Sequence, residues 1–541
     1  MTPTMKTKTF NRSPFIRSSF AALSLSLLAA GTSARAQTTT AWNNAGTDWA
    51  TGANWVGGAP STTVSALFNS SFTNQPQLGT GTTTAQGLWV ANGVAQDVTI
   101  STNDGTTQRT LTITGTATLS SQPRAGIIMD DSGNHNLTLG ASATDPLVVA
   151  ISNDTGFYVN NAGTLTLQGN KNLAIGALTL TLGGNNTAGK IVITRAINGT
   201  GSVVVNTAGT VTLSGQNTLA GTTLTAGTLN INHIKALGIA ATSTFTINGG
   251  KIDNTSGAAI LAAYAYPITI GGNFAFTGGS GTTHDLNLGA GAVDLTGATR
   301  TITANAGKLT LGGVVSNGSL SKAGAGTLAL SGNNTFTGAT TISAGTLVLA
   351  STGTIDNSSG VNLGTSGSQG TLDLTAKTNG FTLGSNQTLS GYGNVTMAAG
   401  KTLTIDGSLA PGNSPGVIGV SGNLTLGSTA TTTMDLIDYS LAPGVGFDQI
   451  SLSGTTPALT YGGTLTLNLT GSTQLGVYHL FTGFSSQSGT FTGGINYSGG
   501  AGSFNYATGE LTLTAVPEPA TWALLAFSLT TVVVLRRRRH S

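Results

Sequence analysis

The densest cluster of side chains that could perform acid–base chemistry is Asp130-Asp131 with His135. A glycosidase needs two carboxyl groups about 5 to 9.5 Å apart across a cleft. Adjacent strand residues point to opposite faces, so Asp130 and Asp131 cannot both face one sugar unless a turn lies there. Gly133 and Asn134 indicate such a turn, and acidic turn residues are commonly solvated. The cluster therefore favours a solvated turn over a catalytic pair.

The remaining candidates for catalysis or metal binding are also weak. His284-Asp285 is the second polar cluster, and Asp435 and Asp438 are lone acids. The chain has neither the Asp-x-Asp-x-Asp-Gly loop nor the Gly-Gly-x-Gly-x-Asp repeats that bind Ca²⁺. The absence of Cys excludes zinc fingers, iron–sulfur centres and thiol catalysis. We expect no catalytic residue, no metal and no cofactor.

Three of the five Trp residues, Trp42, Trp49 and Trp55, lie within 14 residues of one another. A flat aromatic platform can stack on sugar rings, which would make these residues a carbohydrate contact. Alternatively, they form a cap over the open end of a repeat core, which every stacked repeat protein requires. The high average burial of Trp favours the cap.

The elements that would carry these residues are strands. Segments such as Gly-Thr-Leu-Thr-Leu alternate an aliphatic with a small polar residue, the pattern of a strand with one buried face. Gly interrupts every long run, and no comparable stretch of the body has helical period. The pattern recurs at residues 163–167, 209–213, 326–330, 345–349, 370–374 and 463–467.

Two blocks of the sequence align at a distance of 117 residues, 209–231 and 326–349. Each contains a strand, a Ser-Gly-x-Asn-Thr turn, a short strand, an Ala-Gly turn and a further strand. The advance from the first Gly-Thr to the next is 18 residues in one block and 19 in the other. This spacing predicts a coil that stacks on copies of itself, with Gly and Asn in tight turns where φ can be positive.

Composition excludes several classes of protein. Only 7% of residues are charged and 38% are hydrophobic, which argues against intrinsic disorder and against coiled coils. Most of the positive charge lies at the two ends. Residues 37–515 contain 12 Lys and Arg against 17 Asp and Glu, a balance of about −5. A mildly acidic body has no electrostatic footprint for nucleic acid.

The N-terminus has the pattern of a secretory signal peptide. Four cations precede the apolar run 20–30, and Ala34-Arg35-Ala36 is a small-x-small cleavage site. The run is too short to span about 30 Å of hydrocarbon. We expect cleavage after Ala36, which leaves Gln37 as the new N-terminus.

The C-terminus has three parts, Val-Pro-Glu-Pro, a 16-residue apolar run (520–535) and four arginines. The run is about 24 Å long as a helix, marginal for a permanent span. It could be a plain tail anchor. The order of the three parts resembles the PEP-CTERM sorting signal, which implies recognition and removal by an exosortase. The resemblance assigns the sorting signal to Pro517, Glu518, Pro519, Arg536, Arg537, Arg538 and Arg539.

Blocks 209–231 and 326–349 resemble the autotransporter-associated (passenger-associated) β-strand repeat. Pro-Gly-Asn-Ser-Pro-Gly at 411–416 and Phe-Asp-Gln-Ile at 447–450 look like the C-terminal part of such passengers. The resemblance implies an all-β, right-handed parallel β-helix (β-solenoid). The usual membrane β-barrel of autotransporters is not apparent, because the Gly- and Thr-rich style continues to Leu513.

The expected organisation has three parts. Residues 1–36 are a signal peptide, 37–515 the β-helix body and 516–541 the sorting signal with a hydrophobic helix. Within the body, 37–70 form an N-terminal cap and 411–515 the passenger-like part.

The expected function is that of a non-enzymatic, cell-surface or exopolysaccharide-matrix structural or adhesin-like protein. Its expected partners are an exosortase and the secretion machinery, and exopolysaccharide or neighbouring cells. Membrane insertion through the C-terminal helix would be transient, and nucleic acid is not a partner. Two alternatives stay open, an exported polysaccharide lyase or glycosidase on the same fold and a passenger with no binding role.

Overall fold

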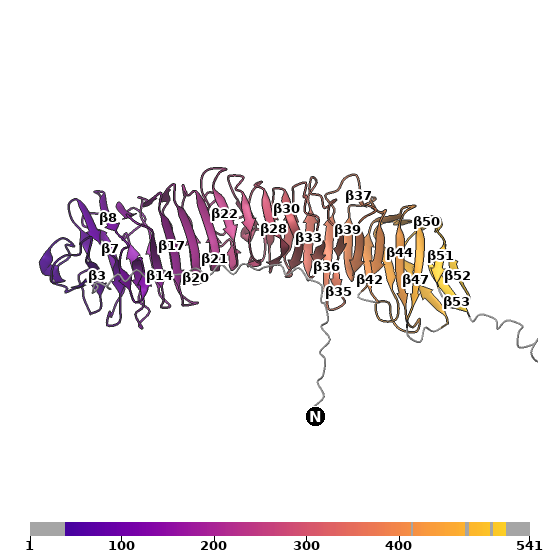
Figure 1. The fold of residues 1–541 in the computed structure, drawn as a ribbon, viewed down its shortest axis with the longest axis horizontal. Coiled ribbons are helices and arrows are strands. Elements are labelled where there is room, and N and C mark those ends of the chain that lie inside the picture. Colours follow the sequence, from indigo (N-terminus) through magenta and orange to yellow (C-terminus); the bar gives the residue numbers. More distant parts are fainter. Residues whose placement is uncertain (1–37, 413–414, 471–474, 498–500, 515–541) are drawn as a thin grey trace, which may run out of the picture. The chain divides into compact units, whose positions relative to one another are not determined.

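The computed structural model describes residues 38–412, 415–470, 475–497 and 501–514. These residues form an all-β body of stacked coils (Figure 1). Nearly all strand pairs between successive coils are parallel, so the predicted parallel β-helix is confirmed. The expected signal peptide and C-terminal helix lie outside the described residues. In the described part of the chain, no helix has the length and apolarity needed to cross a membrane.

Each full coil contributes one strand to each of three columns. The second column runs without interruption through the body. It consists of β4 (Gln77–Leu78), β7 (Val98–Thr102), β12 (Leu137–Leu139), β15 (Thr164–Leu167), β18 (Lys190–Ile193), the second halves of β20 (Ser202–Leu213), β21 (Gly221–Ile231), β28 (Val293–Ala304) and β30 (Val315–Ala323), and β23 (Lys251–Asp253), β26 (Phe274–Phe276), β32 (Thr340–Ile342), β34 (Gly360–Asn362), β38 (Thr388–Gly391), β41 (Ser408–Pro411), β44 (Thr431–Leu436), β47 (Thr464–Leu469) and β51 (Ile495–Tyr497).

The other two columns are each interrupted once. The first column contains β1 (Thr39–Trp42), β3 (Ser65–Phe68), β6 (Leu88–Val90), β11 (Ala125–Met129), β14 (Thr155–Val159), β17 (Thr179–Gly184), the first halves of β20 and β21, β22 (Thr244–Ile247), β25 (Ile268–Ile270), the starts of β28 and β30, and then β37 (Phe381–Leu383), β40 (Thr402–Ile405), β43 (Asn423–Leu426), β46 (Ala458–Tyr461) and β50 (Ser486–Gly489). The third column contains β5 (Thr82–Ala85), β8 (Arg109–Ile113), β13 (Leu147–Ile151), β16 (Leu173–Gly176) and β19 (Ile197–Gly199), and then β24 (Ile260–Leu261), β27 (Leu286–Asn287), β29 (Lys308–Leu311), β31 (Thr327–Leu330), β33 (Gly345–Leu349), β36 (Ser368–Leu374), β39 (Gly393–Met397), β42 (Val417–Ser421), β45 (Gln449–Ser453) and β49 (Phe481–Thr482).

A few short elements stand outside the columns. Two 3-10 turns are present, η1 (Gly52–Asn54) and η2 (Thr282–His284). The remaining strands pair antiparallel with a neighbour, and they are β2 (Trp55–Val56), β9 (Thr118–Leu119), β10 (Gln122–Pro123), β35 (Gly364–Thr365), β48 (Val477–His479), β52 (Ala501–Asn505) and β53 (Glu510–Thr514).

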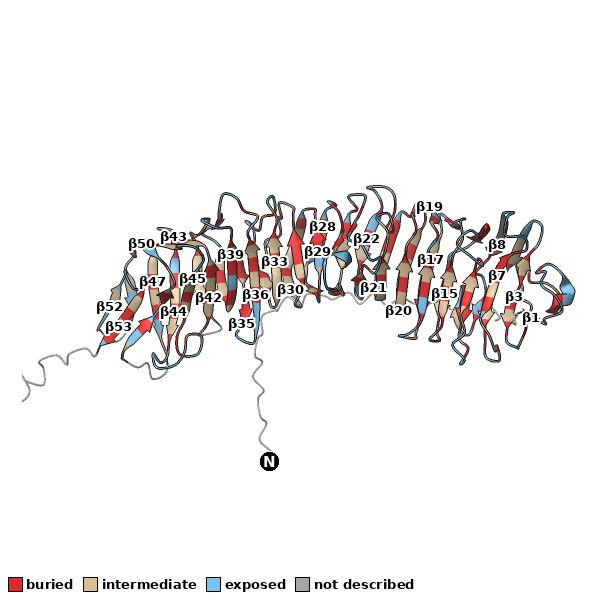
Figure 2. Cartoon of the chain, turned by 180° about the vertical axis from the view of Figure 1, so that it is seen from behind, coloured by how far each residue is buried: buried red, intermediate tan, exposed pale blue. Residues whose placement is uncertain are grey.

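The alternation in the sequence sets which side chains enter the core. In β33, Leu347 and Leu349 are fully buried, whereas Thr346 is only half-buried on the outer side. The parallel register places Leu347 against Leu328 in one direction and Leu372 in the other. Like side chains therefore stack on like, and buried positions alternate with partly exposed ones along most strands (Figure 2). The continuous apolar interior removes these side chains from water and stabilises the stack.

The interruptions are specific to two places. The third column has no strand at residues 214–220 and 232–243, between β19 and β24. The first column has no strand at 331–339 and 350–359, between β30 and β37. In both places the coil is shorter, and a Ser-Gly-x-Asn-Thr motif occupies the position of the first missing strand.

Candidate functional site

The side chains of Asp130 and Asp131 diverge, and each has a structural partner. The indole of Trp89 donates a hydrogen bond to Asp130 Oδ1 at 2.7 Å. Asp131 is only 1% exposed, and its carboxylate accepts from Asn161 and lies 2.8 Å from His135 Nδ1. A turn follows, as expected, but the solvated carboxylate predicted there is wrong for Asp131. Three polar groups, the side-chain amide of Asn161 and the backbone N–H and Nδ1 of His135, satisfy the carboxylate inside the turn and offset the cost of its burial.

The other acids singled out in the sequence are also bound to nearby groups. Asp285 Oδ1 accepts from the backbone N–H of Lys308 at 2.9 Å, and His284 Nδ1 lies 3.1 Å from the carbonyl oxygen of Asn254. Asp435 accepts from Asn468 Nδ2, and Asp438 accepts from Ser440. Among the described residues, no three His, Asp or Glu side chains gather where they could hold a metal ion.

Trp42, Trp49 and Trp55 form one packed cluster at the N-terminal end of the described body. Their exposed fractions are 1%, 1% and 2%. Trp55 contacts both other indoles edge-on at centroid distances of 4.8 Å, and its Nε1 donates to the carbonyl oxygen of Trp49. Stacking on a sugar requires an exposed ring face, and these rings have none. The placement favours packing over the core end, the second of the two interpretations.

The predicted processing residues cannot be placed in the same way. They lie outside the described residues, and they are Ala34, Ala36, Gln37, Pro517, Glu518, Pro519, Arg536, Arg537, Arg538 and Arg539.

The Asn of each Ser-Gly-x-Asn-Thr motif joins three successive coils. Asn217 is fully buried, its Oδ1 accepts from the backbone N–H of Ile197 at 2.8 Å, and its Nδ2 donates to the carbonyl oxygen of Ala236 at 2.6 Å. The side-chain amide thus takes the place of a peptide group in the interrupted column. Pairing these backbone groups is necessary because buried polar groups without partners destabilise a fold.

Three cations that the sequence did not single out, Lys322, Arg195 and Lys377, are buried in the described part of the chain. Lys322 is fully buried, and its ammonium donates to the carbonyl oxygens of Ala323, Gly324 and Ala344. Burial lowers the pKa of Lys322 to about 8. Arg195 is 3% exposed and donates to the carbonyl oxygens of Leu139 and Leu147, two coils earlier. The sequence could have indicated the burial of Lys322. It lies two residues after Leu320 in the same strand, and residues two apart in a strand point to the same face.

Asp448, within the Phe-Asp-Gln-Ile segment, is a buried acid that the sequence did not single out. Its exposed fraction is 1%, and its carboxylate accepts from the backbone N–H groups of Gly416 at 2.6 Å and Asp435 at 2.8 Å. Burial raises the pKa of Asp448 to about 7, although the two hydrogen bonds act in the opposite direction. Asp448 therefore ties the 415–416 region to β44 and has no free carboxylate face.

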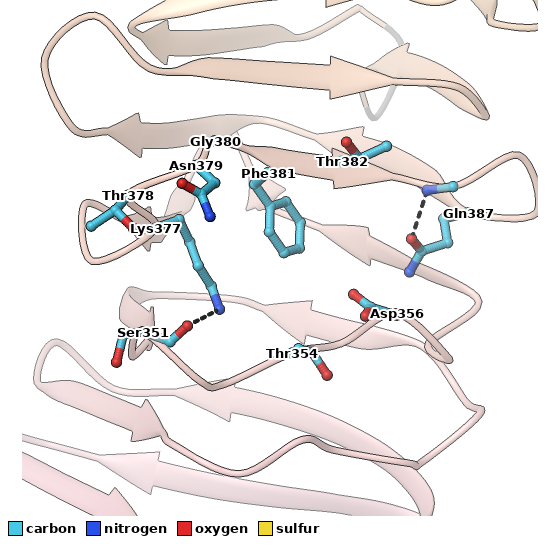
Figure 3. A pocket seen from close by; sticks show the side chains of 11 residues that line it. Ser351, Thr354, Asp356, Lys377, Thr378, Asn379, Gly380, Phe381, Thr382 and Gln387 are labelled. Carbon is cyan, nitrogen blue, oxygen red and sulfur yellow. Dashed lines mark hydrogen bonds between the residues drawn. The ribbon is translucent and has the colours of Figure 1, made fainter.

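Two of the surface pockets lie at the two interruptions. One, of about 520 Å³, opens beside β37 between loops 351–356 and 377–387 (Figure 3). The Phe381 ring lies within it, with polar side chains around it that include Thr354, Asp356 and Asn379. Lys377 closes one side by donating to the carbonyl oxygen of Ser351 at 3.1 Å. The pocket lies where the first column resumes with β37, next to the preceding coil, which has no strand in that column.

The other pocket, of about 530 Å³, lies where the third column stops after β19. Its lining is rich in amides and hydroxyls, and includes Asn170, Asn172, Asn198, Gln216 and Thr218. An amide-rich hollow of this size can exchange hydrogen bonds with polyhydroxylated ligands.

Comparison with known proteins identifies the repeats. Residues 208–231 and 320–349 match the family model of the passenger-associated-transport-repeat. Each matched segment spans one Ser-Gly-x-Asn-Thr motif and the strands on either side of it. No curated protein matches the chain. Repeats of this kind imply an exported, cell-surface protein.

Proposed function

We propose that this chain is a non-enzymatic structural or adhesin-like protein, displayed on the cell surface or held in the exopolysaccharide matrix. The passenger-associated repeats support export and surface display. The observation that carries the proposal is a row of outward hydroxyls on the third column, in which Thr327, Thr346 and Thr371 are direct neighbours on successive strands. Strands lie about 4.8 Å apart, so the hydroxyls repeat at that interval.

Such rows suit weak, repeated contact with a polysaccharide. A single hydroxyl–sugar hydrogen bond contributes little, but linked contacts act at high effective concentration and add to a measurable avidity. Asn394 continues the row beyond Thr371 and offers a donor and an acceptor. The pockets at Phe381 and at Asn198 would add local binding points to the rows.

The binding arm of the proposal is tested by a pull-down of the purified protein with exopolysaccharide and with whole cells. We expect retention that falls when Thr327, Thr346 and Thr371 are all replaced by Ala. A matched control replaces two exposed turn residues that line neither pocket, Thr455 and Thr456, by Ala. Equal retention of both variants would contradict the role of the hydroxyl row. Reducing-sugar release from a polysaccharide panel would contradict the non-enzymatic part.

We also propose that the two ends direct export and sorting. Cleavage after Ala36 would release the signal peptide, and an exosortase would act at Pro517-Glu518-Pro519 after transient insertion of the apolar run 520–535. The residue pattern is the support for both steps. The test is intact-mass and terminal-peptide analysis of the cell-associated and released protein. A mature N-terminus at Gln37 and loss of the tail after about residue 516 are expected, and an intact tail in released protein would contradict sorting.

A further inference from the structure

Five exposed apolar side chains gather at the C-terminal end of the described body. Ten large apolar residues are exposed in the described part of the chain, and half of them fall between residues 439 and 477. We call this set the apolar end patch, and its members with their exposed fractions are Tyr439 (41%), Leu441 (46%), Val445 (60%), Leu475 (51%) and Val477 (39%).

The members of the apolar end patch belong to the loop that follows β44 and to the segment 475–477, which ends at the first residue of β48. Gly476 lies so close to Tyr439 that an added Cβ would meet its ring at 2.5 Å. The Tyr439 and Tyr478 rings are 6.1 Å apart, and Tyr478 itself is fully buried. Leu441 packs against Gly446 within its own loop. Exposed apolar side chains that cluster in this way usually mark a contact surface, whereas single ones need no explanation.

The chain leaves the described body beside this patch. Strand β53 pairs with β48, with Thr512 opposite Val477, and the backbone N–H of Leu513 donates to the carbonyl oxygen of Gly476. The apolar run begins at Ala520, six residues after Thr514. An extended chain spans at most about 3.6 Å per residue, so the run starts within roughly 20 Å of the patch.

We infer that the apolar end patch is a membrane-contact surface, which seats the body on the lipid headgroups while the tail is inserted. The inference rests on the proposed membrane insertion of residues 520–535. A short tether holds the patch at high effective concentration next to the bilayer, so a weak contact suffices. Tyr and aliphatic side chains are the types that enter the interface, where an aromatic ring meets both lipid and water. The contact fixes which end of the coil stack faces the membrane.

Because the chain has no Cys, a single introduced Cys can be labelled specifically. Val445→Cys and Leu261→Cys give single labelling sites of nearly equal exposure, 60% and 59%, and Leu261 lies far from the patch in the sequence. Each full-length variant is labelled with an environment-sensitive fluorophore and mixed with phosphatidylethanolamine–phosphatidylglycerol vesicles. Flotation of the vesicles reports tail insertion, and quenching by doxyl-labelled lipid reports the position of the label.

We expect both variants to float, and only the label at position 445 to shift to the blue. Its emission should fall by at least about half with doxyl lipid, because interfacial apolar groups lie about 5–10 Å into the headgroup region. Adding Leu441→Asp should reduce that quenching. Floating protein with equal, unquenched labels at both positions would overturn the contact surface alone. Protein that does not float would overturn the proposed insertion and the contact surface with it.

Discussion

Asn217 and Asn334, 117 residues apart in the sequence, make the same pair of hydrogen bonds. Asn334 Oδ1 accepts from the backbone N–H of Val315 at 2.9 Å and its Nδ2 donates to the carbonyl oxygen of Thr354 at 2.8 Å, as Asn217 does with Ile197 and Ala236. Asn217 lies in the third column and Asn334 in the first. The motif therefore extends a strand column by one coil wherever it occurs, independently of the column in which it lies.

Replacing Asn334 by Ala should destabilise the coils around it. The substitution leaves a buried N–H on Val315 and a carbonyl on Thr354 without partners, and each such group costs about 1–3 kcal/mol. Long repeat proteins depart from two-state unfolding, so local hydrogen exchange of the Val315 amide is the suitable measurement. We expect faster exchange at that amide. Asn333→Ala, at the exposed neighbouring position, is the control and should leave the exchange rate nearly unchanged.

The role of the Asn in this motif could not be predicted from the sequence, although the fold could. The spacing of the two blocks predicted stacked parallel coils, and the alternation predicted the inward positions of residues such as Leu347. The Ser-Gly-x-Asn-Thr and Ala-Gly segments also predicted turns, with Gly and Asn at positions of positive φ. Gly227 and Gly345 have positive φ, but Asn217 and Asn334 do not. Their role depends on backbone groups of other coils, which a single block of sequence does not contain.

The candidate sites were harder to predict for a related reason. Asp131 and Asp448 each combine donors from their own coil with one donor from an adjacent coil, Asn161 and Gly416 respectively. The hydrogen bond between Gly416 and Asp448, for example, connects residues 32 positions apart in the sequence. Local composition indicates a solvated acid in such places, whereas the stacked coils provide the partners that satisfy it.

A test of the tight turns compares Gly345 with Gly367. Gly345 has φ of +64°, and a Cβ there would meet the carbonyl oxygen of Gly324 at 2.4 Å. Gly345→Ala should lower the free energy of unfolding by about 1–3 kcal/mol because of backbone strain. The steric clash with Gly324 should lower it further. Gly367 has open space around its Cα, so Gly367→Ala should be close to neutral. Equal urea sensitivity of the two variants would contradict the tight packing of the Ala-Gly turn.

The two interpretations of the Trp cluster make different predictions for Trp49. A packed indole predicts that Trp49→Ala costs about 3–5 kcal/mol through cavity formation. It also predicts that soluble polysaccharide leaves the emission of the native indoles unchanged. Val56→Ala is the control, since Val56 follows Trp55 and is 64% exposed. A stable Trp49→Ala variant that loses polysaccharide retention would instead support the sugar platform.

The burial of Asp448 predicts a pH dependence with a definite sign. Its carboxyl has a pKa of 3.8 when unfolded and about 7 when folded. Between these two pH values the folded chain holds a proton that the unfolded chain has released, so the free energy of unfolding falls as pH rises. The contribution is complete below about pH 4 and is lost as pH rises through 7. Asp435 is the neighbouring acid, and its charge acts in the same direction.

The measurement compares wild type with Asp448→Asn between pH 4.5 and pH 8, with urea unfolding of the C-terminal coils followed by hydrogen exchange at the Gly416 and Asp435 amides. We expect the wild type to lose protection across this range after correction for intrinsic exchange. The variant should show a flatter profile, because its amide does not titrate, and a lower protection at pH 4.5, because the amide nitrogen faces one of the two backbone donors. Asp356→Asn, at an exposed position, should retain the wild-type slope. A wild-type slope in Asp448→Asn would show that another group governs the pH response. In that case the two backbone hydrogen bonds would hold the Asp448 carboxylate of the wild type charged across the whole pH range.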